Sequence, residues 1–327
     1  MAVESIFMPD ARDLDVLSVR PVRELESCNH LLDDHTALMR FHDEEGYILL
    51  RDVLDPASVK AAREAMFAVM ERHGLIEPGA TEPVWTGTPS PGGMEESTEF
   101  SGIARRLIEN PVNMRLMEKI LGEPACIIPI VQYRAYPPGG SITGVHQDGF
   151  FSPGIRNYKP VWTPLTNCER EVGGLMLAVR QCNRGFFHNL AKTPSPIPEG
   201  VIPDDSWATT DYFPGDVLIL NPCTPHASMP NTSNRCRVTI DTRVQSAADP
   251  RVLLADIVAA DTDSIHVRTT DGAERRFTVD DETFIRIEHP GVRQKRADYV
   301  PSAAPGKRIV VVFDGDHAET LRRASEN

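Results

Sequence analysis

The sequence lacks several patterns that mark well-known protein classes. Its six cysteines form no C-x-x-C pair, which argues against a zinc knuckle or a dithiol redox motif and favours buried free thiols. No apolar run approaches the roughly 18 residues of a membrane-spanning helix, and the N-terminus lacks the basic-then-apolar pattern of a signal peptide. No repeat of fixed period is visible. We therefore expect a cytoplasmic protein that does not interact with membranes.

A surplus of basic residues is also missing. The net charge is −13 over 327 residues, and residues 251–327 are close to neutral, so neither part of the chain offers the basic surface that nucleic acids require. With 41% hydrophobic and 25% charged residues, the composition is that of an ordinary globular protein with one large domain and a small appendage. A homo-oligomer is compatible with this composition.

Two helices are marked by the residues at their ends. Asp55-Pro56 is typical of an N-cap followed by proline at the first helical position, and apolar residues then follow helical spacing as far as Gly74. A second helix is predicted from Asn110-Pro111 to Gly122. Between them, residues 86–102 are rich in Gly, Pro and Ser without periodicity. They are predicted to form a mobile loop, either a lid or a simple connector.

After Gly122 the pattern changes to short apolar runs separated by turn residues. Strands without intervening helices are predicted at residues 125–134, 161–166, 174–179, 216–220 and 237–244. This pattern and the length of the segment favour a mainly β fold with flanking helices, whose core is a double-stranded β-helix, the cupin-like jelly roll.

Three segments are predicted along the chain. They are an N-terminal extension (1–40), the jelly-roll core with its helices (41–250) and a small β-rich C-terminal appendage (251–327). In the appendage, strands are expected at 253–260, 264–268 and 275–279, with a turn at Asp271-Gly272, whereas residues 317–327 look helical and charged. The residues of the appendage do not indicate its role, and capping of the barrel and dimerisation both remain open.

Three His-x-acid pairs occur in the chain, and a pattern this short arises easily by chance. His42 and His317 lack a further partner and are expected to be solvated surface histidines. His146 and Asp148 differ, because they lie at the end of a predicted strand. A single histidine, His226, also follows an apolar strand 78 residues after Asp148.

Two imidazoles and one carboxylate form the triad that holds non-haem Fe(II) and leaves three coordination positions open. A chelating cosubstrate and O₂ need such positions. Ordinary alternatives exist, since Asp148 is also typical of a turn and His226 of a hydrogen-bonded core histidine. The order of the three residues and their strand context favour the iron site.

A basic residue, Arg237, follows His226 in the next predicted strand. Arg237 comes 11 residues after His226 in the strand-like run RVTIDTRV, so its guanidinium can project into the same barrel and pair bidentately with a carboxylate. An ordinary surface ion pair is the alternative for Arg237. A cosubstrate that carries a carboxylate needs such a partner.

With these residues the chain resembles the phytanoyl-CoA dioxygenase family of Fe(II)/2-oxoglutarate-dependent oxygenases. The resemblance runs from FHDEEGYILLRDVLDP through ENPVNMRLMEKILGEP to RVTIDTRV and covers about two-thirds of the chain. It implies a double-stranded β-helix in which His146, Asp148 and His226 are the catalytic iron ligands. It also implies that Arg237 and Ser228 bind the distal carboxylate of the cosubstrate 2-oxoglutarate.

Other positions match the family less specifically. The resemblance implies cosubstrate contacts for Gln132 and Trp162, although core packing is equally typical of a tryptophan. Where relatives usually have a Pro-Gly-Ser/Thr-His turn, this chain has AVRQCNRGFFHN at 178–189. We therefore expect an unusual substrate-facing loop, and the identity of a relative's substrate does not transfer.

The resemblance implies an oxidoreductase that uses Fe(II), 2-oxoglutarate and O₂. We expect a dioxygenase that hydroxylates an unactivated C–H bond of a small molecule, with secondary metabolism as one setting. Desaturation, epimerisation and ring formation remain open, because the same iron site serves all of them, whereas an intact Asp148 argues against halogenation. The alternative of another class is a cupin-like ligand-binding protein without turnover.

Substrate contacts are expected next to the metal motif. Cationic side chains at the mouth of an acidic protein favour an anionic substrate, although a solvated rim is the ordinary alternative for each of them. The candidates are Arg134, Phe150, Phe151, Arg156, Tyr158 and Lys159.

Overall fold

The computed structural model describes residues 19–89, 98–129, 132–140, 142–152, 154–155, 157–189, 196–288 and 294–324. Its helices are α1 (His35–Glu45), α2 (Pro56–Arg72), α3 (Thr98–Ile108) and α4 (Pro111–Leu121). Both predicted helices are confirmed. α2 is capped by the Asp55 side chain, and α4 is capped by Asn110 and ends at Gly122 in the left-handed region, where glycine avoids a steric clash.

The prediction of a loop over residues 86–102 is wrong at its C-terminal end. Residues 98–102 begin α3, while 90–97 lie outside the described residues. Further along α3, Ile103, Ala104 and Leu107 are buried in a core shared with α2. Burial of this face outweighs the low helix propensity of Gly102, so tertiary contacts decide the structure of the segment.

Two β-sheets form the main body. The first has the order β1 (Arg23–Glu24), β7 (Trp207–Thr209), β6 (Leu175–Ala178), β9 (His226–Ser228). The second has the order β2 (Tyr47–Leu50), β8 (Val217–Leu220), β5 (Lys159–Pro164), β10 (Arg237–Ser246), β3 (Ala125–Ile127), and β4 (Gln132–Tyr136) also pairs with β10. Apolar residues from both sheets share one core, which includes Leu49, Trp162, Leu177 and Leu218. The predicted jelly roll is confirmed.

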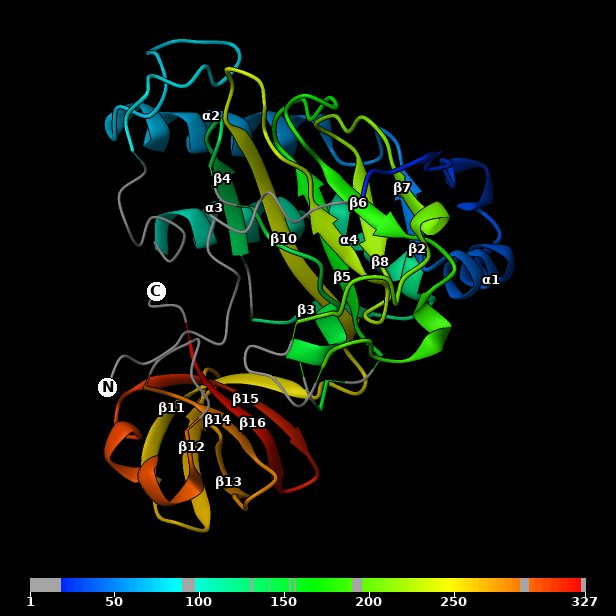
Figure 1. Cartoon of the computed structure of the whole chain (residues 1–327). Helices are drawn as coiled ribbons and strands as arrows, with labels where there is room; N and C mark the ends of the chain where they lie inside the picture. The colour runs from blue at the N-terminus through cyan, green and yellow to red at the C-terminus, as the bar shows by residue number, and fades with distance from the viewer. Residues whose placement is uncertain are drawn as a thin grey trace.

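The helices cover the outer face of the second sheet (Figure 1). Buried residues of α2, α3 and α4 pack with Val238, Ile240 and Val244 of β10. Side chains alternate along a strand, and these three residues of β10 have even numbers. The odd-numbered residues of β10, from Arg237 to Arg243, therefore point toward the interior of the jelly roll. The predicted strands of the core that were given by residue range are confirmed, except that the run 125–134 divides into β3 and the start of β4. The prediction that His146 ends a strand is wrong, because His146 forms only an isolated bridge with His226.

The C-terminal residues form a third sheet with its own apolar core. Its order is β13 (Glu274–Thr278), β12 (Ser264–Thr269), β11 (Val252–Ala260), β15 (Arg308–Asp314), β16 (His317–Arg323), β14 (Phe284–Arg286). The helical prediction for 317–327 is wrong for His317–Arg323, because pairing with β15 buries Ala318 and Leu321 on one side of β16. The domain boundary at residue 250 stays a prediction.

The third sheet packs closely against the main body (Figure 1). Ile128, Ile155 and Tyr158 of the main body share an apolar cluster with residues of β11 and β15. Gly154 has φ +81°, and a Cβ placed on it would lie 2.4 Å from Cβ of Glu319. Only glycine allows this approach, so the segment that follows Asp148 is held against the C-terminal sheet.

The prediction that His42 is solvated is wrong. His42 belongs to α1, and its side chain is fully buried. Its Nδ1 lies 3.2 Å from Asp43 Oδ1 and 3.5 Å from Lys159 Nζ. α1 turns this residue inward, and burial lowers the pKa of His42 to about 4. His317 is partly exposed, as predicted, and its Nε2 lies 3.1 Å from Asp280 Oδ2.

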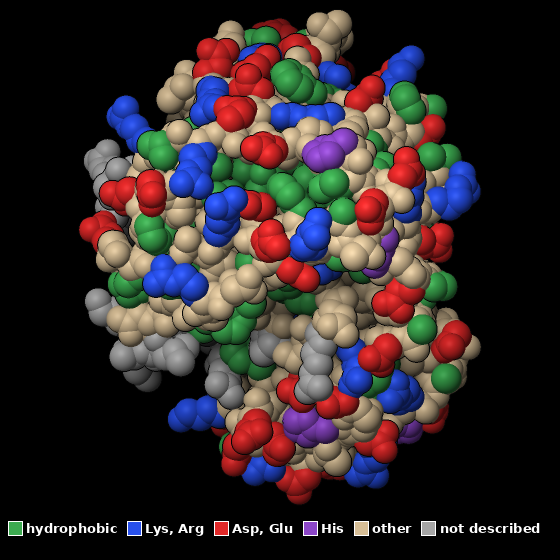
Figure 2. All heavy atoms as spheres, turned by 90° about the vertical axis from the view of Figure 1, so that its right-hand side faces the viewer, with side chains coloured by type: hydrophobic (Ala, Val, Ile, Leu, Met, Phe, Trp, Pro, Cys, Tyr) green, Lys and Arg blue, Asp and Glu red, His purple; other side chains and the backbone are tan. Residues whose placement is uncertain are grey.

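On the face shown in Figure 2, acidic and basic side chains are interspersed over both the main body and the C-terminal sheet. Within the described ranges, no helix has the length and apolar composition to cross a membrane. The cysteines are free, and four of them are buried, namely Cys28, Cys168, Cys182 and Cys236.

Candidate metal centre

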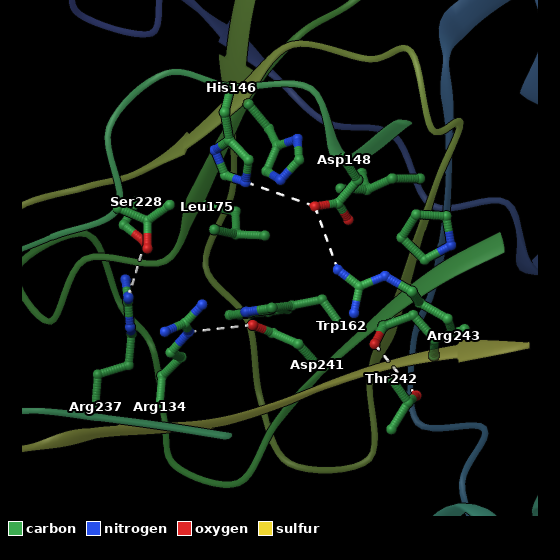
Figure 3. A pocket seen from close by; sticks show the side chains of 15 residues that line it. Arg134, His146, Asp148, Trp162, Leu175, Ser228, Arg237, Asp241, Thr242 and Arg243 are labelled. Carbon is green, nitrogen blue, oxygen red and sulfur yellow. Dashed lines mark hydrogen bonds and ion pairs between the residues drawn. The ribbon is translucent and has the colours of Figure 1, made fainter. Parts of the chain in front are cut away.

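Three predicted ligands converge at one end of the jelly roll. One ligand atom from each of His146, Asp148 and His226 lies within 4.8 Å of the others. The two histidines belong to neighbouring extended segments, which exchange backbone hydrogen bonds of 3.0 and 2.9 Å. Their ring centroids are 4.2 Å apart, and Figure 3 shows the His146 ring directed toward the Asp148 carboxylate.

The hydrogen bonds of the imidazoles fix which nitrogen is available. Nδ1 of His146 lies 2.9 Å from the Gly144 carbonyl oxygen, and Nδ1 of His226 lies 3.0 Å from that of Thr224. A carbonyl only accepts, so Nδ1 carries the proton in each ring and Nε2 keeps its lone pair. Burial also lowers the pKa of His226 to about 4. Both features are typical of histidines that bind metals.

The Asp148 carboxylate completes the donor set. Burial alone would raise its pKa, but the opposing charge of Arg243 lowers the pKa well below its ordinary value. Oδ1 of Asp148 lies 3.6 Å from Nη2 of Arg243 and 3.6 Å from Nε2 of His146. Two neutral imidazoles and one ionised carboxylate are the donors that suit ferrous iron.

Gln147, between two of these residues, is a site residue that the sequence did not indicate. Its side-chain amide donates hydrogen bonds to the carbonyl oxygens of Gly185 (2.9 Å) and Cys223 (2.7 Å) and accepts one from Phe187 N (2.8 Å). Its side chain is fully buried. Gln147 therefore joins the turn that carries Asp148 to two other loops.

Arg237 is buried in the same cavity, on β10. Its Nη2 donates to Ser228 Oγ (2.9 Å), and Nη1 donates to the carbonyl oxygens of Gly173 and Gly174. The guanidinium lies 4.4 Å from the centre of the Tyr136 ring. These contacts hold a cation in place beside the candidate metal site, where it can receive the carboxylate of a cosubstrate.

One cavity joins the candidate metal site to Arg237. Together with its open mouth it encloses about 530 Å³. The three ligand candidates, Ser228, Arg237 and Trp162 line it together. Trp162 also packs at an angle of 68° against Tyr212, so it serves both the cavity and the core.

The remaining candidates lie in different places. Arg134 lines the cavity, where its Nε lies 3.4 Å from Asp241 Oδ2. Gln132 lies on β4 opposite Asp241, but its side chain is outside the described residues, as is all of Arg156. Lys159 lies against His42 of α1, which separates it from the other candidate substrate contacts.

Aromatic side chains surround the turn that carries Asp148. The Phe150 ring stacks on His188 with centroids 3.9 Å apart, and the Phe151 ring lies 6.2 Å from that of His146. Tyr158 is buried, and its hydroxyl has no hydrogen-bond partner among the described residues. These residues form an apolar wall near the candidate metal site.

Two charged residues in the cavity were not predicted as site residues. Asp241 and Arg243 line it together with Arg237, and all three stand at odd positions of RVTIDTRV. Charged residues that recur with period two inside an otherwise apolar strand indicate a polar interior face. That alternation was visible in the sequence.

Comparisons with known proteins found a family match, sequence relatives and structural neighbours. The sequence model of the phytanoyl-CoA dioxygenase family matches residues 42–239. The 1-deoxypentalenic acid 11-beta-hydroxylases of Streptomyces exfoliatus and Streptomyces arenae are each 30% identical to this chain, over 68% of its length and 86% of theirs. A crystal structure of EctD from S. alaskensis in its apoform is 14% identical, with a TM-score of 0.49 over 75% of this chain and 89% of that one.

Proposed function

Because this chain belongs to the phytanoyl-CoA dioxygenase family, we propose that it hydroxylates an unactivated C–H bond of a small molecule in the cavity that holds His146, Asp148 and His226. The chain is an Fe(II)/2-oxoglutarate-dependent oxygenase, and its reaction uses Fe(II), 2-oxoglutarate and O₂. The observation that carries the assignment of the site is that this triad and Arg237 line one cavity.

In this proposal the iron is held by Nε2 of His146, Nε2 of His226 and the carboxylate of Asp148. The protein supplies one negative charge to a dication, so the loaded site keeps a net positive charge that attracts anionic groups. Three ligands on one face leave the opposite positions open. The carbonyl groups of Gly144 and Thr224 keep both rings oriented for this task.

We assign the distal carboxylate of 2-oxoglutarate to Arg237 and Ser228. The Arg237 guanidinium is almost completely buried, and its Nε has no hydrogen-bond partner among the described residues. A carboxylate bound here would neutralise a cation that the fold has already removed from water. Trp162, and Gln132 on the neighbouring strand β4, are proposed as further contacts of the cosubstrate.

When bound, iron and 2-oxoglutarate supply the oxidising chemistry, in which 2-oxoglutarate is converted to succinate and CO₂. The residues of the chain position the reactants and exclude water. Phe150 and Phe151 stand beside the candidate ligands and provide apolar surface for a substrate. Arg134 and Tyr158 are proposed as polar substrate contacts.

Hydroxylation is favoured over the other outcomes because both curated relatives are named as hydroxylases. Desaturation, epimerisation and ring formation remain alternatives at the same site. A ligand-binding protein without turnover is set aside, since the chain belongs to a family of oxygenases. A cytoplasmic location, a homo-oligomer, and a setting in secondary metabolism stay predictions.

The test is turnover of a library of small carboxylic acids that begins with 1-deoxypentalenic acid, with Fe(II), 2-oxoglutarate and ¹⁸O₂. We expect succinate and a product that carries one ¹⁸O atom. Asp148→Ala should abolish both and lower the iron content, whereas His317→Ala, on the surface of the C-terminal sheet, should behave as the wild type. A product that lacks the label would favour desaturation, epimerisation or ring formation. Full activity of Asp148→Ala would remove this residue from the site.

A further inference from the structure

Two arginines of the C-terminal sheet stand beside the candidate metal site. Arg286 of β14 and Arg322 of β16 are direct neighbours in a parallel pair of strands. Nη2 of Arg286 donates a hydrogen bond of 3.2 Å to the carbonyl oxygen of Phe151, the last residue of the short 3₁₀ turn that begins with Asp148. The sheet therefore reaches the turn that carries a candidate iron ligand.

A third arginine faces these two from the main body. Arg243 on β10 lines the cavity, and its Nε and Nη1 are buried without a hydrogen-bond partner among the described residues. Burial, and then the charge of Arg243, lower the pKa of Arg286 to about 10. Burial lowers the pKa of Arg322 as well, with contributions from Arg286 and Arg243. Geometry places the three guanidinium groups in one neighbourhood, because Arg286 and Arg322 are paired, Arg286 reaches Phe151 and Arg243 reaches Asp148 of the same turn.

Arg243 has a carboxylate partner that the proposed function already uses. Nη2 of Arg243 lies 3.6 Å from Asp148 Oδ1, but Asp148 serves the iron in the proposed function. The Arg322 backbone belongs to the ladders with β14 and β15, and its side chain forms no ion pair or hydrogen bond within the described part of the chain. Once iron shares the charge of Asp148, positive charge remains in excess at this place, and a bound anion would relieve the repulsion.

The cavity has two cationic ends. Figure 3 shows Arg237 with Ser228 on one side and Arg243 on the other, with Trp162 and Asp241 between them. Arg237 is held by hydrogen bonds to Ser228 and to backbone carbonyls and is assigned to 2-oxoglutarate. The second end is therefore available for a different anionic group.

We propose that Arg286 and Arg322 of the C-terminal sheet join Arg243 to form an anion-binding subsite, which holds a carboxylate or phosphate group of the substrate beside the iron. This proposal rests on the proposed function and adds a substrate class to it. It also gives the C-terminal sheet a role, because two of the three cations come from β14 and β16. Arginine suits this task, since its planar guanidinium binds either group bidentately.

The neighbourhood of the subsite fits an anionic group on an apolar body. Tyr158 is buried, and the charges of Asp148 and Arg243 both act on the pKa of its hydroxyl, so the hydroxyl lies in the same neighbourhood. Phe151 supplies apolar surface beside Arg286. A small organic acid would place its charged group among the arginines and its carbon skeleton against the aromatic wall, toward the iron ligands.

The experiment measures binding of two simple probes, hexanoate and inorganic phosphate, to the anaerobic Fe(II)·2-oxoglutarate form of the full chain by calorimetry. Hexanamide has the same chain without the charge and serves as the neutral control. We expect saturable binding of at least one anion and none of hexanamide. The anion that binds more tightly identifies the chemical group.

Variants locate the binding site. Arg286→Gln and Arg322→Gln should each weaken anion binding by about tenfold or more, the effect of losing a hydrogen bond to a charged group. Arg322→Lys should retain part of the affinity. Arg268→Gln removes the same charge from an exposed position of the same sheet, where Arg268 pairs with Glu274, and should bind as the wild type.

Each result decides for or against the subsite. Unchanged affinity in Arg286→Gln and Arg322→Gln, equal losses in Arg268→Gln, equal binding of hexanamide, or no anion binding by the wild type would each overturn it. The 2-oxoglutarate titration of the same proteins separates this proposal from the proposed function. A wild type that binds 2-oxoglutarate but no probe contradicts the subsite alone, whereas a wild type that does not bind 2-oxoglutarate contradicts the proposed function.

Discussion

At the scale of single residues, Arg237 shows how a buried cation is prepared for a ligand. Backbone carbonyls and Ser228 hold its guanidinium, and the Tyr136 ring covers one face. None of these partners carries a negative charge. A desolvated cation with neutral partners favours an anionic ligand strongly, because no competing charge has to be displaced.

The corresponding prediction is that Arg237→Gln weakens 2-oxoglutarate binding while iron still binds. A hydrogen bond to a charged group contributes roughly 1.5–3 kcal/mol, so losing two costs about 3–5 kcal/mol, or on the order of 10² to 10³ in affinity. An anaerobic titration of the Fe(II) protein, followed through the visible band of the chelate, gives the midpoint. Arg235→Gln is the control, because Arg235 pairs with Glu169 instead. Equal midpoints for the wild type and Arg237→Gln would remove Arg237 from the site.

Gln147 leads to a second prediction at this scale. Gln147→Met keeps the shape of the side chain but loses its three hydrogen bonds to neighbouring loops. We expect iron affinity to fall by about 10- to 100-fold, as for other residues that orient metal ligands, with little change in 2-oxoglutarate affinity at saturating iron. Competition with a metal chelator measures the first quantity. Unaltered iron affinity would show that the loops keep Asp148 in place without Gln147.

The residues that the sequence indicated and those that it did not differ in one physical respect. His226 and Arg237 are polar residues at the first positions of β9 and β10, and His146 and Asp148 form a His-x-Asp pair that matches a known ligand pattern. Gln147 lies between these two residues and matches no such pattern, so only its contacts in the folded chain reveal its role. Its hydrogen bonds join residues that are far apart in the sequence.

At the scale of elements, the orientation of α1 was also not predictable from the sequence. Asp43, Glu44 and Glu45 directly follow His42, which suggested a surface. The helix turns His42 inward, where it contacts Lys159 of β5. Helix ends and strand runs were predictable, because caps and periodicity are local. The side of α1 that faces the sheet depends on packing between distant segments.

This burial predicts a pH dependence of stability. Burial lowers the pKa of His42 from its ordinary value of 6.5 to about 4, so the unfolded state takes up the proton first as the pH falls. The free energy of unfolding is unaffected by His42 above pH 6.5 and decreases between pH 6.5 and 4, by about 3 kcal/mol in total. His42→Leu should lose this part of the dependence.

Urea denaturation at pH 7 and at pH 4.5 measures the effect. The difference in unfolding free energy between the two pH values should be smaller for His42→Leu than for the wild type. His30→Leu, at an exposed position, should keep the wild-type difference. If His42→Leu and the wild type lose stability equally, the acid sensitivity originates in other groups.

At the scale of the whole molecule, the C-terminal sheet and the jelly roll meet where the segment after Asp148 passes β15 and β16. The sequence predicted a C-terminal appendage and three of its six strands. Where this sheet packs on the jelly roll was not predictable, because the apolar cluster between them joins residues that are far apart in the chain. Glycine at 154 is the local sign of this contact. The left-handed backbone there and the approach of Glu319 both exclude a side chain.

The last prediction compares two glycines that differ in this respect. Gly154 and Gly272 both have positive φ, +81° and +87°, but a Cβ at Gly272 meets nothing within 4 Å, whereas one at Gly154 would lie 2.4 Å from Glu319 Cβ and 3.2 Å from Val312 Cγ1. Both Ala variants carry the cost of the backbone conformation, about 1 kcal/mol. Gly154→Ala should lower the free energy of unfolding by about 1–3 kcal/mol more, the cost of overpacking. Calorimetric unfolding of both variants gives the difference. Equal destabilisation would mean that the sheet yields at this point, so that the contact with the segment after Asp148 is loose and the arginines of β14 and β16 are not held firmly beside the iron ligands.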